Sequence, residues 1–217
     1  MTQPPTPAPT RVLCIRHGET DWNAAGRWQG NAPVPLNDVG RAQSAALGRY
    51  IADNRARLAA LYSSDLPRAW QTAQAIAEAL GLPIQPEPRL REVDLGDWQG
   101  LTRNEVLAWD ADRYAAYRAD WRNIPAPNGE SRAALRRRAR AAFDDITARH
   151  AGQTVALVTH GGTLGMLLES LFGHLERPSL TNTSITLVER PHPGDAWTLA
   201  RAAWSPHLDE APLGETW

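Results

Sequence analysis

Residues 154–162 read Thr-Val-Ala-Leu-Val-Thr-His-Gly-Gly, and residues 12–18 read Val-Leu-Cys-Ile-Arg-His-Gly. Each stretch is a short apolar run that ends near a histidine followed by glycine, the pattern of a buried strand that meets a tight connection. The first stretch passes at once into a helical pattern over Thr163–Phe172. A strand followed directly by a helix is the unit of parallel α/β sheets, so these stretches predict that fold class.

The rest of the chain continues this alternation of strands and helices. We expect further strands at Leu58–Tyr62, Ser184–Val188 and Trp197–Ala202, and helices at Asp38–Asp53 and Leu66–Leu80. Helices that connect parallel strands cover both faces of a sheet. The sequence therefore predicts a three-layer α/β/α sandwich with a mostly parallel central sheet, in which the last strand lies at an edge.

Residues 94–127 have a different composition. Trp98, Trp109 and Trp121 stand among several arginines there, and the stretch ends in a proline-rich turn. We expect a mainly helical insertion over one end of the sheet, and two interpretations stay open: a substrate lid, or a small satellite core with solvated arginines. Residues 11–205 are then a single domain that contains this insertion, residues 1–10 a disordered tail rich in proline, and residues 206–217 a C-terminal tail.

Composition excludes several classes of protein. The 217 residues carry 23 basic and 24 acidic side chains, and a net charge of −1 argues against a main role in binding nucleic acid or an anionic membrane. Every basic residue is arginine, which excludes a Schiff-base lysine and the lysine of a P-loop. No stretch reaches the roughly 20 apolar residues of a membrane span. No targeting signal is visible, so we expect a cytoplasmic protein.

The cysteine and histidine content narrows the chemistry further. Cys14 is the only cysteine, so neither an internal disulfide nor a zinc ribbon can form. A cysteine-based phosphatase would need an arginine at the position of Thr20. The histidines that could build a zinc site lack any recognised ligand spacing; they are His17, His150, His160 and His174. We therefore expect no metal and no cofactor.

Several side chains are expected to meet at one edge of the sheet. Open parallel sheets bind ligands beyond the carboxyl ends of their strands, where His17 and His160 would lie. Arg16 precedes the first histidine, and Arg68 falls in the first turn of a helix that follows another strand. Two guanidiniums and two imidazoles suit a tetrahedral dianion such as phosphate, because arginine offers fixed bidentate donors. The free N–H groups of the helix after the second histidine favour the same ligand.

Several blocks carry a more specific signal, and in chain order they are Arg16-His17-Gly18-Glu19-Thr20, Gly26-Arg27-Trp28-Gln29-Gly30, Ser63-Ser64-Asp65-Leu66-Pro67-Arg68, Leu90-Arg91-Glu92, Gly129-Glu130-Ser131 and Val158-Thr159-His160-Gly161. Together they resemble the signature of the histidine phosphatase superfamily, in its phosphoglycerate-mutase-like branch. The blocks stand in family order between about residues 11 and 190, so the resemblance rests on several motifs and not on one.

The resemblance implies a role for each matched residue. His17 resembles the nucleophile that accepts the phosphoryl group as phosphohistidine, and Glu92 resembles the acid that protonates the leaving oxygen and then activates water. The residues implied to stabilise or bind the phosphate are Arg16, Arg68, His160, Asn23, Gln29 and Gly161. The candidate substrate contacts of a lid are Trp98, Arg103 and Trp121.

The implied activity is that of a metal-independent phosphomonoesterase acting on a small phosphorylated metabolite. Mutases of the family carry a lysine near the acid, and this chain has none. Asp94 and Asp97 would also repel a bis-anionic glycerate, so hydrolysis is favoured. The alternatives are a cofactor-dependent phosphoglycerate mutase and a non-catalytic binding protein on the same fold. Relatives often dimerise, so a homodimer is a further expectation.

One predicted helical stretch is rich in arginine, at Arg132, Arg136, Arg137, Arg138 and Arg140. Three of these are spaced four residues apart and share one face of a helix. Such a stripe is typical of a solvated face balanced by nearby carboxylates, here Asp144 and Asp145. We therefore expect it to be structural and not a nucleic-acid surface.

Overall fold

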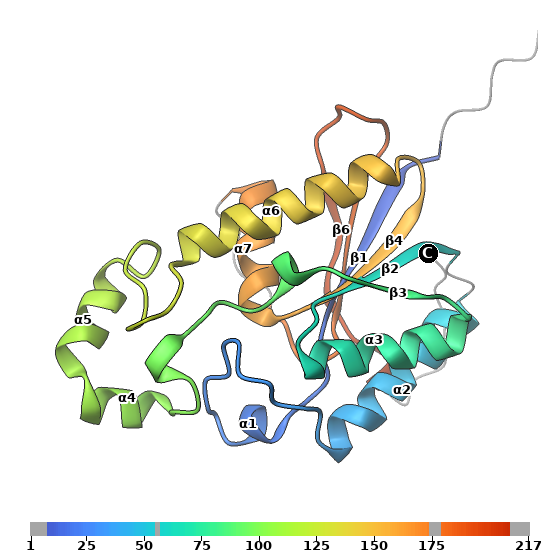
Figure 1. The fold of residues 1–217 in the computed structure, drawn as a ribbon. Coiled ribbons are helices and arrows are strands. Elements are labelled where there is room, and N and C mark those ends of the chain that lie inside the picture. Colours follow the sequence, from blue (N-terminus) through green and yellow to red (C-terminus); the bar gives the residue numbers. More distant parts are fainter. Residues whose placement is uncertain (1–7, 55–56, 174–178, 209–217) are drawn as a thin grey trace, which may run out of the picture.

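A six-stranded sheet in the order β3-β2-β4-β1-β5-β6 forms the centre of the computed structural model, which describes residues 8–54, 57–173 and 179–208 (Figure 1). The strands are β1 Thr10–Arg16, β2 Leu58–Ser63, β3 Ile84–Pro86, β4 Thr154–Thr159, β5 Ile185–Arg190 and β6 Thr198–Trp204. The α-helices are α1 Asp21–Ala24, α2 Asp38–Asp53, α3 Pro67–Leu80, α4 Arg103–Trp109, α5 Ala111–Ala119, α6 Arg132–Arg149 and α7 Gly161–Phe172. Short 3₁₀ helices are η1 Pro88–Leu90, η2 Gly96–Trp98 and η3 Pro206–Leu208.

The pairing of the strands confirms the predicted α/β class with a mostly parallel sheet. β1, β4, β2 and β3 run parallel to one another, whereas β5 is antiparallel to β1 and β6 is antiparallel to β5. β6 lies at an edge, as expected. The opposite edge strand, β3, was not predicted, because three residues that end in Pro86 are too few to show a strand period.

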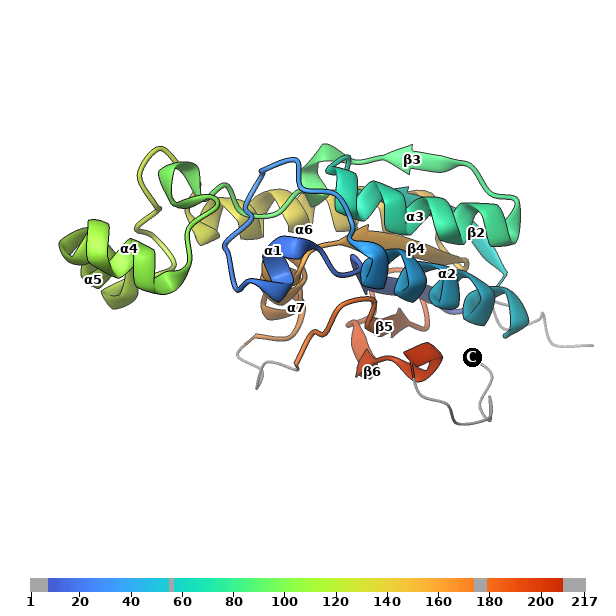
Figure 2. The same cartoon turned by 90° about the horizontal axis from the view of Figure 1, so that it is seen from below.

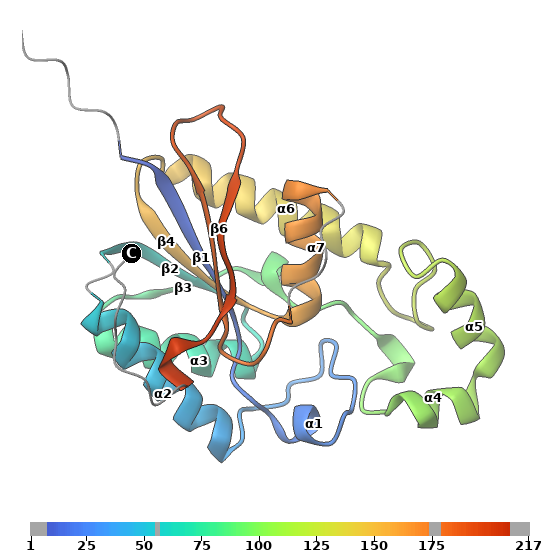
Figure 3. The same cartoon turned by 180° about the vertical axis from the view of Figure 1, so that it is seen from behind.

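Alternate residues of β1 enter different cores on the two faces of the sheet. Val12 and Cys14 lie in one core with side chains from α6 and α7. Leu13 and Ile15 lie in the other with side chains from α2 and α3. Figures 1 and 3 show the two helix pairs on opposite sides of the strands. Since successive side chains of a strand point to opposite faces, this burial gives the predicted three-layer sandwich.

The helix boundaries follow local chemistry. α2 has the predicted bounds, and the side chain of Asn37 caps it by accepting the backbone N–H of Gly40. α7 begins at Gly161, two residues earlier than predicted. The prediction began at Thr163 because glycine has a low helix propensity. A Cβ atom on Gly162 would lie 2.5 Å from a carboxylate oxygen of Glu92, so the glycine allows that carboxylate to approach the first turn.

Residues 94–127 fold as η2, α4 and α5 around a third core, beyond the carboxyl ends of the parallel strands (Figure 2). The buried residues of this core are Val93, Leu95, Trp98, Val106, Tyr114, Ala126, Leu135 and Met166. The fully buried ring of Trp98 packs against the rings of Trp28, Tyr114 and Tyr117. The insertion thus contains a satellite core. The ring of Trp98 lies within this core and has no solvent-exposed face, and its contact with a substrate stays a prediction.

Replacing Trp98 with alanine is expected to lower the free energy of unfolding by about 3–5 kcal/mol, because the change leaves a large cavity in the satellite core. Chemical denaturation measures this. The control is Trp109→Ala, since the Trp109 side chain in α4 is 60% exposed and its loss should change stability by less than about 0.5 kcal/mol. Equal effects of the two substitutions would contradict a structural role for Trp98.

The ends of the chain are described only in part. Residues 1–7 of the expected N-terminal tail and residues 209–217 of the expected C-terminal tail lie outside the described residues, as does His174. Residues 206–208 form η3. Within the described ranges, no helix combines the length and the apolar character that crossing a membrane requires.

Candidate active site

The carboxyl ends of β1, β2 and β4 bring the predicted residues together. The parallel register pairs Arg16 with Thr159 in β1 and β4. His17 and His160 are the next residues along the two strands, and the centroids of their rings lie 5.1 Å apart. Both side chains are buried. Adjacent parallel strands with matched ends therefore place the two histidines side by side, as the sequence predicted.

The ring of His17 is held in one orientation. Its Nδ1 atom lies 2.7 Å from the carbonyl oxygen of Gly18, so this nitrogen carries the proton and donates it. Nε2 is then the unprotonated nitrogen, and it accepts a hydrogen bond from Nε of Arg68 at 3.3 Å. Burial, with the charges of Arg68 and Arg16, holds the pKa of His17 well below 6.5. The ring is therefore neutral at neutral pH, with a lone pair at Nε2.

Arg68 is a fully buried cation beside this lone pair. It lies in the first turn of α3, which begins at Pro67. Its guanidinium donates to the carbonyl oxygens of Gly30 at 2.7 Å and Ala32 at 3.0 Å as well as to His17. Burial lowers the pKa of Arg68 to about 10, so the side chain stays charged at neutral pH. These carbonyls set the direction in which the guanidinium points.

Two buried side-chain nitrogens near His17 have no partner among the described residues. One is Nε of Arg16. A terminal nitrogen of the same guanidinium donates to the carbonyl oxygen of Leu180. The other is Nδ1 of His160. Nε2 of His160 lies 2.8 Å from the hydroxyl of Ser64, and burial holds the pKa of His160 well below 6.5. Unpaired buried polar atoms are costly, and a ligand in the site would supply the partners of these two nitrogens.

Glu92 completes the site from the segment after η1. One of its carboxylate oxygens accepts the backbone N–H of Gly162 at 2.8 Å. The other accepts the N–H of Val93 at 2.9 Å and the hydroxyl of Thr163 at 3.2 Å. The carboxylate thus lies at the N-terminal turn of α7, the helix that begins directly after His160. A group there can exchange a proton with a bound ligand.

The residues expected to add phosphate contacts are near this edge. Asn23 belongs to α1, where its side-chain oxygen accepts from the backbone N–H of Thr20 and from the side chain of Asn182. Gln29 is buried, with an amide oxygen that lacks a partner among the described residues. Gly161 is the first residue of α7, and a Cβ atom there would lie 3.6 Å from Nε of Arg16. Their role in binding stays a prediction.

The two other proposed lid contacts are placed within the insertion and beside α6. Arg103 is exposed, and its guanidinium lies 5.9 Å from the ring centroid of Tyr114. Trp121 is half-buried, with the guanidiniums of Arg122 and Arg132 at 4.9 and 5.8 Å from its ring centroid. Their contact with a substrate stays a prediction.

Sequence reasoning missed several residues that support the nucleophile. Asn182, in the turn before β5, donates through its side chain to the backbone carbonyl of His17 at 3.0 Å. The backbone N–H of Thr183 donates to the carbonyl of Arg16 at 3.1 Å. Thr183 takes a φ of 58°, a left-handed conformation that is strained for a β-branched residue. The only sequence signal was their position immediately before a predicted strand.

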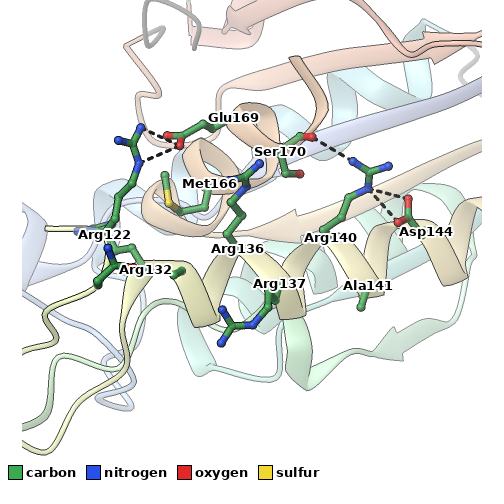
Figure 4. Close-up of a pocket in the computed structure, with 12 residues that line it drawn as sticks. Arg122, Arg132, Arg136, Arg137, Arg140, Ala141, Asp144, Met166, Glu169 and Ser170 are labelled. Carbon is green, nitrogen blue, oxygen red and sulfur yellow. Dashed lines mark hydrogen bonds and ion pairs between the residues drawn. The ribbon is translucent and has the colours of Figure 1, made fainter. Parts of the chain in front are cut away.

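The arginine-rich stretch lies in α6, and all of its arginines except Arg138 line a pocket of about 580 Å³ between α6 and α7 (Figure 4). Arg140 pairs with Asp144 in this pocket, as expected, whereas Asp145 pairs with Arg89. Figure 4 shows Arg136 pointing toward α7 and Arg137 pointing away from it. Across the described ranges, no group of three or more histidine, cysteine, aspartate or glutamate side chains is arranged to hold a metal ion.

The arrangement of two guanidiniums, two neutral imidazoles and a carboxylate at the carboxyl edge of an α/β sheet is typical of a phosphatase-type enzyme. Residues 12–204 match the histidine phosphatase superfamily (branch 1), and the chain belongs to this superfamily. Phosphoglycerate mutase-like protein 4 of Arabidopsis thaliana is 36% identical over 207 residues, which cover 92% of this chain and 87% of that protein.

Solved structures agree with this assignment. The structure of Bacillus stearothermophilus YhfR superposes with a TM-score of 0.82 at 33% identity, covering 92% of this chain and 100% of that one. The mycobacterial glucosyl-3-phosphoglycerate phosphatase in complex with VO3 superposes with a TM-score of 0.78 at 30% identity, covering 90% of this chain and 99% of that one. The chain is thus similar both to a phosphatase and to a protein named for its likeness to mutases.

Proposed function

We propose that the protein is a metal-independent phosphomonoesterase that hydrolyses a small phosphorylated metabolite through a phosphohistidine on His17. The observation that carries this proposal is the orientation of His17: Nδ1 donates to Gly18, which leaves the lone pair of Nε2 directed at the guanidinium of Arg68. A neutral imidazole whose reactive nitrogen faces a buried cation is a nucleophile aimed at a phosphate site.

In the first step, Nε2 of His17 forms a bond to phosphorus as the bond to the ester oxygen breaks. Glu92, protonated for this step, gives its proton to the departing oxygen, so an alcohol leaves. The phosphoryl oxygens carry the charge of the transition state, and Arg16 and Arg68 lie where they can stabilise it. The unpartnered Nδ1 of His160 adds a third donor.

In the second step, the carboxylate of Glu92 takes a proton from water, and the oxygen of that water forms a bond to phosphorus as the bond to Nε2 breaks. Inorganic phosphate leaves, His17 returns to its neutral form and Glu92 is protonated for the next turnover. Dividing the reaction through the covalent intermediate replaces one difficult displacement by two easier ones.

Phosphoglycerate mutase is the second candidate, because a curated relative carries a mutase-like name. The chain lacks lysine. Asp94 and Asp97 lie in the insertion, where Asp97 bonds to the side chain of Asn128 and Asp94 to the backbone of Gly96. Their negative charge would repel a second anionic group on a substrate bound beside the insertion, which supports hydrolysis.

The test is phosphate release from an aryl phosphate in excess chelator, beside an assay for isomerisation of phosphoglycerate with a bisphosphoglycerate primer. We expect hydrolysis that chelation leaves unchanged and no isomerisation that depends on the primer. Loss of hydrolysis on chelation, with recovery on adding metal, would contradict the metal-free mechanism. Primer-dependent isomerisation that exceeds hydrolysis would favour the mutase instead.

A further inference from the structure

The segment that carries Glu92 is held through its backbone carbonyls. Each of the four successive carbonyl oxygens from residue 89, within η1, to residue 92 accepts a hydrogen bond from a side chain. The hydroxyl of Thr159 binds the carbonyl of Leu90 at 2.7 Å. The other three carbonyls all bind the guanidinium of Arg138. The hydroxyl of Thr163 also donates to the carbonyl of Arg91, at 2.8 Å. One side chain of α6 therefore contacts three of the four carbonyls of this segment.

All the N–H groups of the Arg138 guanidinium donate hydrogen bonds. One terminal nitrogen donates to the carbonyls of Arg89 at 2.8 Å and Arg91 at 2.6 Å, and the other donates to the carbonyl of Glu92 at 2.7 Å. The second terminal nitrogen and Nε also bind the two carboxylate oxygens of Glu130, at 2.7 and 2.8 Å. A guanidinium has five N–H groups in a fixed plane, and these contacts engage all of them.

The neighbouring arginines do not share this role. Successive helical residues are separated by about 100°, so Arg138 lies roughly opposite the face that carries Arg136 and Arg140. Figure 4 shows that pair projecting toward the pocket between α6 and α7. The side chain of Arg138 is 22% exposed, whereas Arg136 and Arg137 are exposed residues. Arg136 and Arg137 are thus exposed, whereas Arg138 contacts the segment that carries Glu92.

We propose that Arg138 is a positioning residue that holds the carboxyl of Glu92 at the distance needed for proton transfer; this rests on the proposed function of Glu92 as general acid and base. Arg138 acts through the main chain, since its contacts to this segment are all to carbonyl oxygens. Proton transfer requires the acid to lie within hydrogen-bond reach of the leaving oxygen, and a displacement of about 1 Å can cost about 10²-fold in rate.

The test compares esters whose leaving groups differ in their need for a proton. A nitrophenolate leaves without protonation, whereas an alkoxide does not. In the Arg138→Lys variant, which keeps the charge but not the planar fork, we expect kcat/KM to fall about 10²-fold for an alkyl phosphate. For nitrophenyl phosphate we expect a change of less than about threefold. Glu92→Gln should show the same selectivity with a larger loss.

Controls separate positioning from a loss of folding. Arg140→Lys is the matched control, because Arg140 lies in the same helix and pairs with Asp144; it should leave both esters unaffected. Arg138→Gln serves as a second variant that removes the charge, with its folded fraction measured by denaturation before kinetics. It should show the same dependence on the leaving group.

The outcomes distinguish two failures. If the Arg138 variants lose the same factor with every ester, or lose nothing, while Glu92→Gln keeps its dependence on the leaving group, the positioning role of Arg138 is overturned and the proposed function stands. If Glu92→Gln shows no such dependence, the assignment of Glu92 as general acid fails, and the inference for Arg138 fails with it.

Discussion

Replacing His17 with alanine is expected to lower the rate of phosphate release at least about 10⁴-fold, because the substitution removes the atom that forms the bond to phosphorus. The side chain is buried, and its Nε2 atom faces Arg68. Among the described residues of the site, no other side chain has an unprotonated nitrogen that is bonded to Arg68. Initial rates of phosphate release from an aryl phosphate measure the effect.

The control for this substitution is His192→Ala, in the turn between β5 and β6, which should leave the rate unchanged. A second measurement detects the intermediate directly. A brief reaction of the native protein, stopped in alkali, should leave a phosphorylated protein. Its phosphoryl group should be lost in acid. Phosphate release by His17→Ala within about tenfold of the native rate would contradict the covalent mechanism.

Replacing Arg68 with alanine is expected to lower kcat/KM about 10³-fold, since one buried cation next to the developing charge is removed. The carbonyl oxygens of Gly30 and Ala32 also lose their donor. Arg68→Lys should lose about 10²-fold, because an ammonium group keeps the charge but cannot reach both carbonyls and the substrate in the same geometry. Steady-state kinetics with an aryl phosphate measure both variants.

Arg137→Ala is the matched control for Arg68, because it removes an exposed arginine of α6 and should not change kcat/KM. The stability of each Arg68 variant is followed by denaturation, since an unpaired buried carbonyl costs about 1–3 kcal/mol. If Arg68→Lys retained the full native kcat/KM, the planar guanidinium would not be part of the phosphate site.

The sequence predicted the sheet and the site together, for one physical reason. Parallel strands end at the same edge, so a histidine at each strand end is enough to expect His17 and His160 close together. Arg68 could be placed there as well, because it lies in the first turn after the next strand. By contrast, β3 was missed because three residues carry no pattern, and the early start of α7 was hidden by its glycines.

The tertiary structure decided which way ambiguous side chains face. Trp98 could have been a lid contact or a core residue, and only its packing against Trp28 and Tyr114 shows the second. Arg138 stood in a run of arginines that the sequence assigns to a solvated face. Its guanidinium instead points into the fold, where it binds backbone carbonyl oxygens of residues 46 to 49 positions away in the chain.

The amino-acid sequence by itself determined the α/β class and the residues at the strand ends, because both follow from contacts between neighbours in the chain. The contact between Nε2 of His17 and Arg68, the burial of Trp98 and the partners of Arg138 were decided only by the tertiary structure. Each depends on where a carbonyl or a ring lies in the folded chain, and the orientation of such a group is set by packing and not by local spacing.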